Sequence, residues 1–328
     1  MRKTCLRIPY LLLISFLMLF GPITYSQNPS LNYPNKQITL VVPYTTGSTA
    51  DLLARHIGNK LSTKLSVPII VDNRAGAAGV IGTDFVAKSA PDGYTILFTA
   101  TSHASVAAIR TKLPYDPIQG FSAISLLATS AMGLVINPNL PLNSYQDFIA
   151  HVKSNPNQYT YSSPGTGTTQ HLAMELLKQK GGLEILHVPY KGISGAITDL
   201  MGGHVQASVV SLQAANTYLQ SGQLKMLAIF SEDRSKAFPK VPTLKQVGMN
   251  EVVDTWYGVL GPAKLPSEII QKLNTEMNLQ LNTPELKDLM DKQGLNQVGG
   301  PSERMQNLLQ TDISKWKLVV KNGNIKTE

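Results

Sequence analysis

The sequence predicts an α/β fold in two lobes, and two observations support this prediction. Short apolar runs alternate with amphipathic stretches from residue 38 to about residue 280, a pattern typical of parallel sheets covered by helices on both faces. A motif made of an apolar strand, a Gly/Thr/Ser turn and a helix also occurs twice, around Gly47 and around Gly167. A chain of about 300 residues is long enough for two domains, so we expect one copy of the motif in each lobe.

Apolar runs bounded by turn residues predict the strands. The predicted strands are Ile38–Val42, Val67–Val71, Tyr94–Phe98, Ile124–Leu127, Gly133–Ile136, Tyr159–Ser162, Ile185–Val188, Val205–Val210, Met226–Phe230 and Tyr257–Leu260. Between them, apolar residues recur at helical spacing, as at Leu53, Ile57 and Leu61. Because the strands are almost continuously apolar, both faces of the sheets are expected to be buried, which favours mostly parallel sheets.

Cap residues place the helix boundaries. Ser48-x-x-Asp51 resembles a capping box, with a hydroxyl at the helix cap and an acid in the first turn. The C-terminal third changes character, because Pro262 and Pro266 precede amphipathic stretches with little strand content. The helices predicted there are Glu268–Leu281, Pro284–Lys292 and Ser302–Lys321. We expect this tail to pack back across one lobe.

Residues 1–26 have the pattern of a secretory signal peptide. A basic start leads into the apolar run Leu11–Phe20, and the small residues Thr24 and Ser26 precede a predicted cleavage before Gln27. The apolar run is about half the ~20 residues that cross a bilayer, which disfavours the alternative of an uncleaved anchor. The mature protein is therefore predicted to be exported to the periplasm.

Composition excludes several classes of function. The only cysteine, Cys5, lies in the predicted signal peptide, so neither a disulfide nor a thiolate nucleophile is expected in the mature chain. The signal peptide carries three of the 29 basic residues and no acidic one, which leaves a net charge of +5 on the remainder. These basic residues are scattered, so no nucleic-acid-binding patch is predicted.

The two repeated turns predict anion-binding sites. They read Thr45-Thr46-Gly47-Ser48-Thr49 and Pro164-Gly165-Thr166-Gly167-Thr168. A helix start leaves backbone N–H groups unpaired and carries the positive end of the helix dipole, so it attracts a carboxylate without a charged side chain. The second turn lacks the lysine of a P-loop, and an ordinary helix-start loop remains its alternative interpretation. Two such turns predict two lobes that close on one small anion.

Other chemistries are weakly supported. No G-x-S-x-G elbow is present, and Ser162 and Ser163 lie too far along the chain from His171 to form a dyad by spacing. Local packing or hydrogen bonding of His171 on its helix is the favoured alternative. The six histidines show no metal-ligand spacing. We therefore predict no catalytic residue, no metal and no cofactor.

Two further features have ordinary structural explanations. Gly76-x-x-Gly79-x-x-Gly82 lacks both the G-x-G opening and the later acid of a dinucleotide fingerprint, which favours a Gly-rich turn entering a close-packed helix. Lys191 is a candidate charge partner for an anion, and a solvated loop lysine is the alternative.

Ordered motifs across nearly the whole mature chain resemble one known family. They include Val42-Pro43-Tyr44-x-x-Gly47, Asn73-Arg74-x-Gly76-Ala77-x-Gly79, Pro91-Asp92-Gly93-Tyr94-Thr95, Leu113-Pro114-Tyr115-Asp116, His171-Leu172-Ala173-x-Glu175, His187-Val188-Pro189-Tyr190-Lys191-Gly192 and Asp199-Leu200-x-Gly202-Gly203. With these motifs the chain resembles the Bug or TctC-like solute-binding proteins of tripartite tricarboxylate transporters. The resemblance implies a type II-like periplasmic binding protein, with two mostly parallel sheets flanked by helices and joined by crossover strands.

The resemblance also implies a ligand site between the lobes. Its predicted residues are Tyr44, Thr45, Thr46, Gly47, Ser48, Thr101, Ser102, His103, Ser162, Ser163, Gly165, Thr166, Gly167, Thr168 and Ser211. Family members usually carry Pro-Phe-Pro-Pro-Gly-Gly in the first loop, where this chain has Pro43-Tyr44-Thr45-Thr46-Gly47-Ser48. Two threonines in place of prolines add amide and hydroxyl donors, from which we hypothesise a more polar pocket mouth.

These inferences together predict a monomeric receptor that captures a small carboxylate and delivers it to a membrane permease. The predicted first domain comprises residues 27–128 and 251–328, and the second comprises residues 129–250. A binding protein that presents its closed form to a signalling receptor is one alternative function. An exported enzyme on the same scaffold is another.

Overall fold

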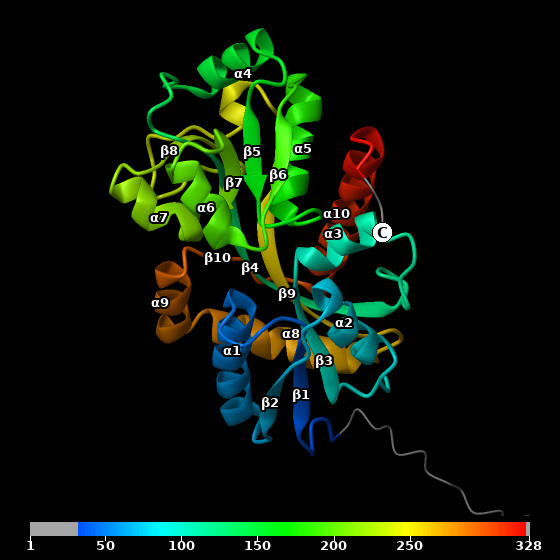
Figure 1. The fold of residues 1–328 in the computed structure, drawn as a ribbon. Coiled ribbons are helices and arrows are strands. Elements are labelled where there is room, and N and C mark those ends of the chain that lie inside the picture. The colour runs from blue at the N-terminus through cyan, green and yellow to red at the C-terminus, as the bar shows by residue number, and fades with distance from the viewer. Residues whose placement is uncertain (1–31, 326–328) are drawn as a thin grey trace, which may run out of the picture. The chain divides into compact units, whose positions relative to one another are not determined.

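A ten-stranded mixed sheet runs through the protein and carries helices on its faces (Figure 1). The computed structural model describes residues 32–325, so the predicted signal peptide and its cleavage point lie outside the described residues. Residues 34–328 form one unit of the chain, and the fold below is that of its described part.

Most predicted elements are present, with ends shifted by a few residues. The strands are β1 (Ile38–Val42), β2 (Ile69–Asn73), β3 (Thr95–Ala100), β4 (Phe121–Ile136), β5 (Thr160–Ser163), β6 (Leu186–Pro189), β7 (Ala207–Ser211), β8 (Lys225–Ile229), β9 (Asp254–Pro262) and β10 (Asn296–Gln297). The α-helices are α1 (Thr49–Leu65), α2 (Val80–Ala87), α3 (Ser102–Ile109), α4 (Tyr145–Ser154), α5 (Thr169–Gly181), α6 (Ile193–Met201), α7 (Leu212–Gln220), α8 (Ser267–Leu281), α9 (Pro284–Lys292) and α10 (Ser302–Asn322).

The strand β4 replaces two predicted strands and joins the two halves of the sheet. Its first part pairs with β9 as far as Ala131, opposite Asp254, and from Met132 it pairs instead with β7 and β8. The polar pair Thr129-Ser130 interrupts the apolar run, which is why the sequence predicted a break there. In the structure Ser130 is buried and pairs with Thr255 of β9.

We call the elements on the two halves of the sheet the first and second lobes. The first lobe has β1, β2, β3, β9, β10 and the start of β4, and the second has the end of β4 with β5 to β8. Strands β1 to β3 are parallel, as are β5 to β7, but β4 and β9 run antiparallel to their neighbours. The predicted parallel arrangement therefore holds within each lobe and fails at the strands that connect them.

This topology places the loops that follow β1, β3, β5 and β7 close to the point where the two lobes meet. In the first lobe β3 ends at Ala100, opposite Tyr257 near the start of β9. In the second lobe β7 ends at Ser211, opposite Met132, where β4 changes partners. The carboxyl ends of β1 and β3 therefore face those of β5 and β7, and ligands of parallel α/β sheets bind outside such strand ends.

The C-terminal helix α10 packs on both lobes, although the sequence predicted contact with one. It lies against α3 and β4 and continues to α5, where Gln179 Nε2 donates to the Val319 carbonyl at 2.8 Å. Its buried Asp312 accepts a hydrogen bond from Trp256 Nε1 at 2.8 Å. A helix of 21 residues is about 31 Å long, which is enough to reach from one lobe to the other.

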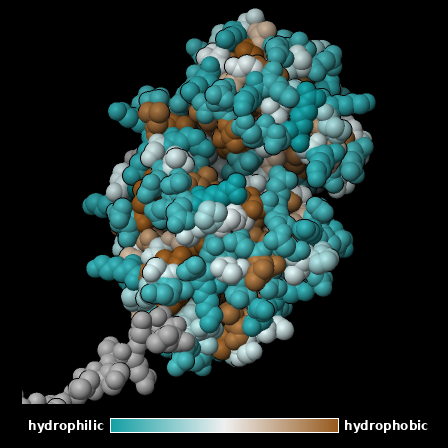
Figure 2. All heavy atoms as spheres, turned by 180° about the vertical axis from the view of Figure 1, so that it is seen from behind, coloured by the Kyte–Doolittle hydropathy of each residue, from teal (hydrophilic) through white to brown (hydrophobic). Residues whose placement is uncertain are grey.

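The surface is mostly polar. Figure 2 shows one hydrophilic face on which apolar residues form small, separate groups. The exposed large apolar side chains lie on several elements and are Ile70, Ile81, Phe85, Leu186, Leu279 and Leu318. Among residues 32–325, no helix combines the length and the apolar character that crossing a membrane requires.

Two helical glycines provide a test of how closely α2 packs behind the first repeated turn. A Cβ on Gly82 would lie 2.8 Å from the Arg74 carbonyl oxygen and 3.0 Å from Pro43 Cβ. We expect Gly82→Ala to lower the free energy of unfolding by about 1–3 kcal/mol because the helix must move away. Gly58→Ala in α1 is the control, since its Cβ would meet Ile69 Cγ2 at an ordinary 3.4 Å. That control should be neutral or stabilising by up to about 1 kcal/mol. Equal urea midpoints for the two variants would contradict the close packing.

Candidate functional site

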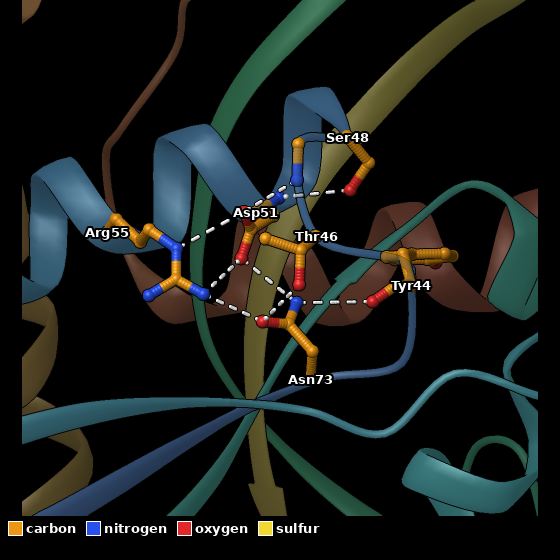
Figure 3. Close-up of polar contacts among 7 residues, drawn as sticks. Tyr44, Thr46, Ser48, Asp51, Arg55 and Asn73 are labelled. Atoms are coloured by element: carbon orange, nitrogen blue, oxygen red, sulfur yellow. Dashed lines mark hydrogen bonds and ion pairs between the residues drawn. The ribbon is translucent and has the colours of Figure 1, made fainter.

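A buried carboxylate holds the first repeated turn. Loop one, residues 43–48, joins β1 to α1, and Ser48 Oγ caps the helix by accepting from the Asp51 amide at 3.2 Å. The Gly47 N–H donates to Asp51 Oδ2 at 2.9 Å, with Gly47 at a φ of 83° that glycine adopts without strain. Figure 3 shows Asp51 at the centre of these contacts. The predicted capping box is thus present in altered form, because the carboxylate reaches Gly47 rather than the cap residue.

The negative charge of Asp51 is compensated by Arg55 and Asn73, two residues that the sequence did not single out as site residues. Arg55 Nη2 lies 3.0 Å from Asp51 Oδ1. Asn73 Nδ2 donates both to that oxygen at 2.9 Å and to the Tyr44 carbonyl at 3.2 Å. Burial alone would raise the pKa of Asp51. Hydrogen bonds from Arg55, Gly47 and Asn73, together with the charge of Arg55, outweigh burial and hold that pKa below its ordinary value.

Tyr44 joins loop one to the loop after β3. Its hydroxyl lies 2.6 Å from Ser102 Oγ and 3.3 Å from Thr99 Oγ1, and it accepts the Ala100 amide at 3.0 Å. Burial raises the pKa of Tyr44 above its ordinary value. The next three residues, Thr45 to Gly47, are exposed at the tip of the loop. The threonines that distinguish this chain therefore lie where a ligand can reach them.

Loop two, residues 164–168, repeats the geometry of loop one in the second lobe. It joins β5 to α5, and Thr168 Oγ1 caps the helix by accepting from the His171 amide at 3.3 Å. Gly167 has a φ of 84°, and its N–H donates to His171 Nδ1 at 3.1 Å. The favoured interpretation of His171, a local hydrogen bond on its helix, is therefore confirmed. The imidazole of His171 therefore accepts the glycine N–H in loop two, as the carboxylate of Asp51 does in loop one.

Each helix start leaves two backbone amides for a ligand. The cap amides bond back into their own loops, from Ser48 to the Thr45 carbonyl at 3.2 Å and from Thr168 to the Gly165 carbonyl at 3.3 Å. At these two helix starts, the amides without an acceptor among the described residues are those of Thr49, Ala50, Thr169 and Gln170. Unpaired amides at a helix start attract an anion.

Ser162 and Ser163 support loop two from within. Ser162 Oγ donates to the Ala196 carbonyl at 3.2 Å. Ser163 Oγ lies 2.7 Å from His187 Nε2 and accepts from the Gly165 amide at 3.2 Å. Both serines are at most 1% exposed, so they shape the loop from behind and offer no hydroxyl at its surface.

The remaining predicted residues divide into two groups. Ser211 caps α7 by accepting the Ala214 amide at 3.3 Å, so a third capped helix start lies at the same level. Thr101 Oγ1 instead accepts the Trp256 amide at 2.6 Å inside the fold. The ring of His103 is buried beside Tyr115 and Phe121, and its Nε2 lies 2.9 Å from the Pro117 carbonyl. Burial lowers the pKa of His103 to about 4.

Contacts between the lobes flank the two loops. Thr49 Oγ1, at the start of α1, lies 3.5 Å from Gln213 Oε1 at the start of α7. A Cβ on Gly167 of loop two would lie 2.5 Å from Ile109 Cδ1 of α3. Loop two therefore adjoins the first lobe, and α1 adjoins the second. Gln213 carried no sequence signal, because only the topology brings it to α1.

A separate cavity of about 600 Å³ lies at the β8 and β10 edges of β4. Its lining contains none of the predicted site residues. The charged groups in its wall have both signs and are Glu232, Asp233, Arg234, Lys236, Asp254, Asp291 and Arg304. Burial raises the pKa of Asp254 to about 7. The described residues contain no cluster of three or more His, Cys, Asp or Glu suited to a metal ion.

Removing the carboxylate of loop one should cost stability. Asp51→Ala leaves the Gly47 amide, Arg55 and Asn73 without their acceptor, and we expect the free energy of unfolding to fall by about 1–3 kcal/mol. The loss should shrink progressively below about pH 4, where the same carboxyl in the unfolded chain takes up a proton, because the pKa of Asp51 in the folded protein lies lower. Asp288→Ala is the control, because the Asp288–Lys292 pair is exposed and should contribute at most about 0.5 kcal/mol. Urea unfolding that gave the same loss for both variants would contradict the role of Asp51.

Comparisons with known proteins agree with this arrangement. The profile of the tripartite tricarboxylate transporter family receptor matches residues 53–325. Protein BugT of Bordetella pertussis is 35% identical over 297 residues, which cover 90% of this chain and 91% of BugT. An R. palustris protein solved with adipate has a TM-score of 0.76 at 31% identity, over 90% of this chain and all of its own. MatC from Rhodopseudomonas palustris, solved with bound malate, has a TM-score of 0.72 at 26% identity, over 88% of this chain and all of its own. The chain has the two-lobed α/β fold of these binding proteins and belongs to the family of tripartite tricarboxylate transporter receptors.

Proposed function

We propose that this protein is a periplasmic receptor that captures a small dicarboxylate between its lobes and delivers it to the permease of a tripartite transporter. The observation that carries the proposal is the pair of matching loops, each of which presents two unpaired amides at a helix start. Two opposed anion sites suit the two ends of a dicarboxylate. Malate and adipate, the acids in the structures of the two relatives, are both dicarboxylates.

The energetics require contributions beyond the helix dipoles. A helix start stabilises an anion by about 0.3–1 kcal/mol, and by up to about 2 kcal/mol when partly buried. Micromolar affinity requires about 8 kcal/mol. The exposed hydroxyls of Thr45 and Thr166 are placed to add hydrogen bonds, since charged acceptors strengthen such bonds to about 1.5–3 kcal/mol each. The hydroxyl of Thr46 already donates to Asn73 Oδ1 at 3.3 Å.

Ligand binding would close the lobes about the connecting strands. The proposed domains are residues 27–128 with 251–328, and residues 129–250. A ligand that touches loop one and loop two together favours the closed state by its extra contacts there. This hinge is supported by the change of partners along β4 and by the start of β9 at the same level.

The buried position of Ser163 argues against an enzyme on this scaffold. Its contact with His187 has the distance of a nucleophile–base pair. The serine has no exposed surface, however, and its hydroxyl is engaged within loop two. A substrate held at the loop tips would not reach it.

A thermal-shift screen tests the proposed function. Residues 27–328 are screened against mono-, di- and tricarboxylates, amino acids and uncharged solutes. A dicarboxylate at 100 times its dissociation constant adds about 2.7 kcal/mol, which should raise the unfolding midpoint of a chain of this length by about 4 °C. Silence across all carboxylates, with a response to uncharged or cationic solutes, would overturn the proposal.

Filling loop two should weaken binding strongly and leave the fold intact. Gly165 has a φ of 147°, and its Cβ would lie 3.3 Å from the Tyr190 carbonyl oxygen, so Gly165→Val must displace the loop. We expect the affinity for the acid found in the screen to fall at least about ten-fold, or about 1.4 kcal/mol. Gly248→Val is the control, because Gly248 also has a positive φ but open space around it. That control should lose stability and keep its affinity. Retained affinity in Gly165→Val would show that loop two is not part of the site.

A further inference from the structure

A stack of three rings lies behind loop two. The ring of His187 on β6 adjoins both Tyr161 on β5, at a centroid distance of 4.8 Å, and His171 on α5, at 4.1 Å, and the centroids of Tyr161 and His171 are 6.4 Å apart. His171 is 3% exposed. Both imidazoles bond to loop two or its support, His171 through the Gly167 amide and His187 through Ser163 Oγ.

The hydrogen bond from Gly167 requires a particular protonation state of His171. An amide N–H can only donate, so Nδ1 of His171 must carry a lone pair. The bond between Ser163 and His187 differs, because a hydroxyl can donate to a neutral ring and accept from a protonated one. Protonation of His171 on Nδ1 would therefore place two donors against each other, whereas His187 could gain a proton and keep its partner.

We propose that His171 is the positioning residue of loop two, and that this loop releases its ligand when the imidazole of His171 takes up a proton on Nδ1. The proposal rests on the proposed function for its ligand and on the Gly167–His171 contact for its mechanism. In loop one, the corresponding acceptor is the carboxylate of Asp51, whose pKa is held below its ordinary value and whose oxygens keep lone pairs after protonation. Loss of the acceptor on protonation is therefore specific to loop two.

The surroundings of His171 favour its neutral form. Its neighbours with titratable groups are Tyr161 on β5, His187 on β6, and Glu175 and Lys178 on α5. Burial, then the charge of Lys178, lowers the pKa of His171 to about 4. Burial lowers the pKa of His187 to about 4 as well, with the neighbouring His171 next in importance. Because the charge on one imidazole lowers the pKa of the other, protonation of one histidine disfavours protonation of its neighbour.

The elements packed around α5 add no competing charge at the imidazole. α3 contributes the apolar Ile109 beside Gly167, and β7 contains no titratable residue. The buried carboxylate of α10, Asp312, is paired with Lys315 and Trp256 Nε1. Glu175 is bonded to Tyr161 and Lys178. His171 is therefore the group at loop two whose protonation state decides the contact with Gly167.

Two substitutions distinguish the role of His171 as a hydrogen-bond acceptor from the effect of its protonation. His171→Asn places an amide oxygen near the position of Nδ1, so it keeps an acceptor that does not titrate. His171→Leu removes the acceptor. The first readout needs no ligand and follows the ¹H–¹⁵N amide resonance of Gly167 from pH 7 to pH 3.5. We expect this resonance to titrate near pH 4 in the wild type and to stay nearly constant in His171→Asn, with the Gly47 amide as the internal reference.

The second readout is calorimetric binding of malate. At pH 7, His171→Asn should bind within about three-fold of the wild type, and His171→Leu at least about ten-fold more weakly. At pH 3.5, a group with a pKa of about 4 should weaken the wild type about four-fold more than His171→Asn. Protonation of malate itself affects both proteins equally and cancels in this ratio.

The two readouts distinguish failure of the inference from failure of the function. A Gly167 resonance that does not titrate, or titrates equally in His171→Asn, would overturn the positioning role. Equal malate affinity of His171→Leu and wild type at pH 7 would overturn it too. If malate bound neither protein while Gly167 titrated as expected, the hydrogen bond between Gly167 and His171 would stand and the choice of malate as the ligand would fail.

Discussion

The site depends on one hydrogen bond made twice, from a glycine N–H to the side chain four residues further on. Asp51 accepts it in loop one and His171 accepts it in loop two. In each loop this bond fixes a left-handed glycine directly before the cap, and the cap hydroxyl then satisfies the third amide of the helix. The amides of the first two helical residues then have no acceptor among the hydrogen bonds of the described residues, which is the condition for capturing an anion by backbone alone.

The sheet brings these two loops to the same place. Strand β4 belongs to both lobes, and its change of partners between Ala131 and Met132 aligns the strand ends of the two lobes. Helix α10 supports this arrangement from the side, because it packs on α3 in the first lobe and α5 in the second. A ligand held by both loops would therefore bind next to β4 and β9, the two strands about which we propose that the lobes move.

Much of this arrangement follows from sequence patterns that have a local cause. The strand Ile38–Val42, the helix Pro284–Lys292 and both repeated turns form where the apolar runs and cap residues predict them. The continuity of β4 could not be predicted, because burial of Ser130 depends on β9, a strand more than a hundred residues away. The same limit applies to the site. Asn73 and Gln213 reach the loops only through tertiary contacts, and the interior position of the His103 ring depends on Tyr115 and Phe121.

A crystal structure with the acid that gives the largest thermal shift would show which groups hold the ligand. We expect one carboxylate within hydrogen-bond distance of the Thr49 and Ala50 amides, and the other within that distance of the Thr169 and Gln170 amides. A ligand bound instead in the cavity beside β8 and β10, or held mainly by charged side chains, would contradict this expectation. Either result would also show whether the exposed threonines of loop one contact the ligand.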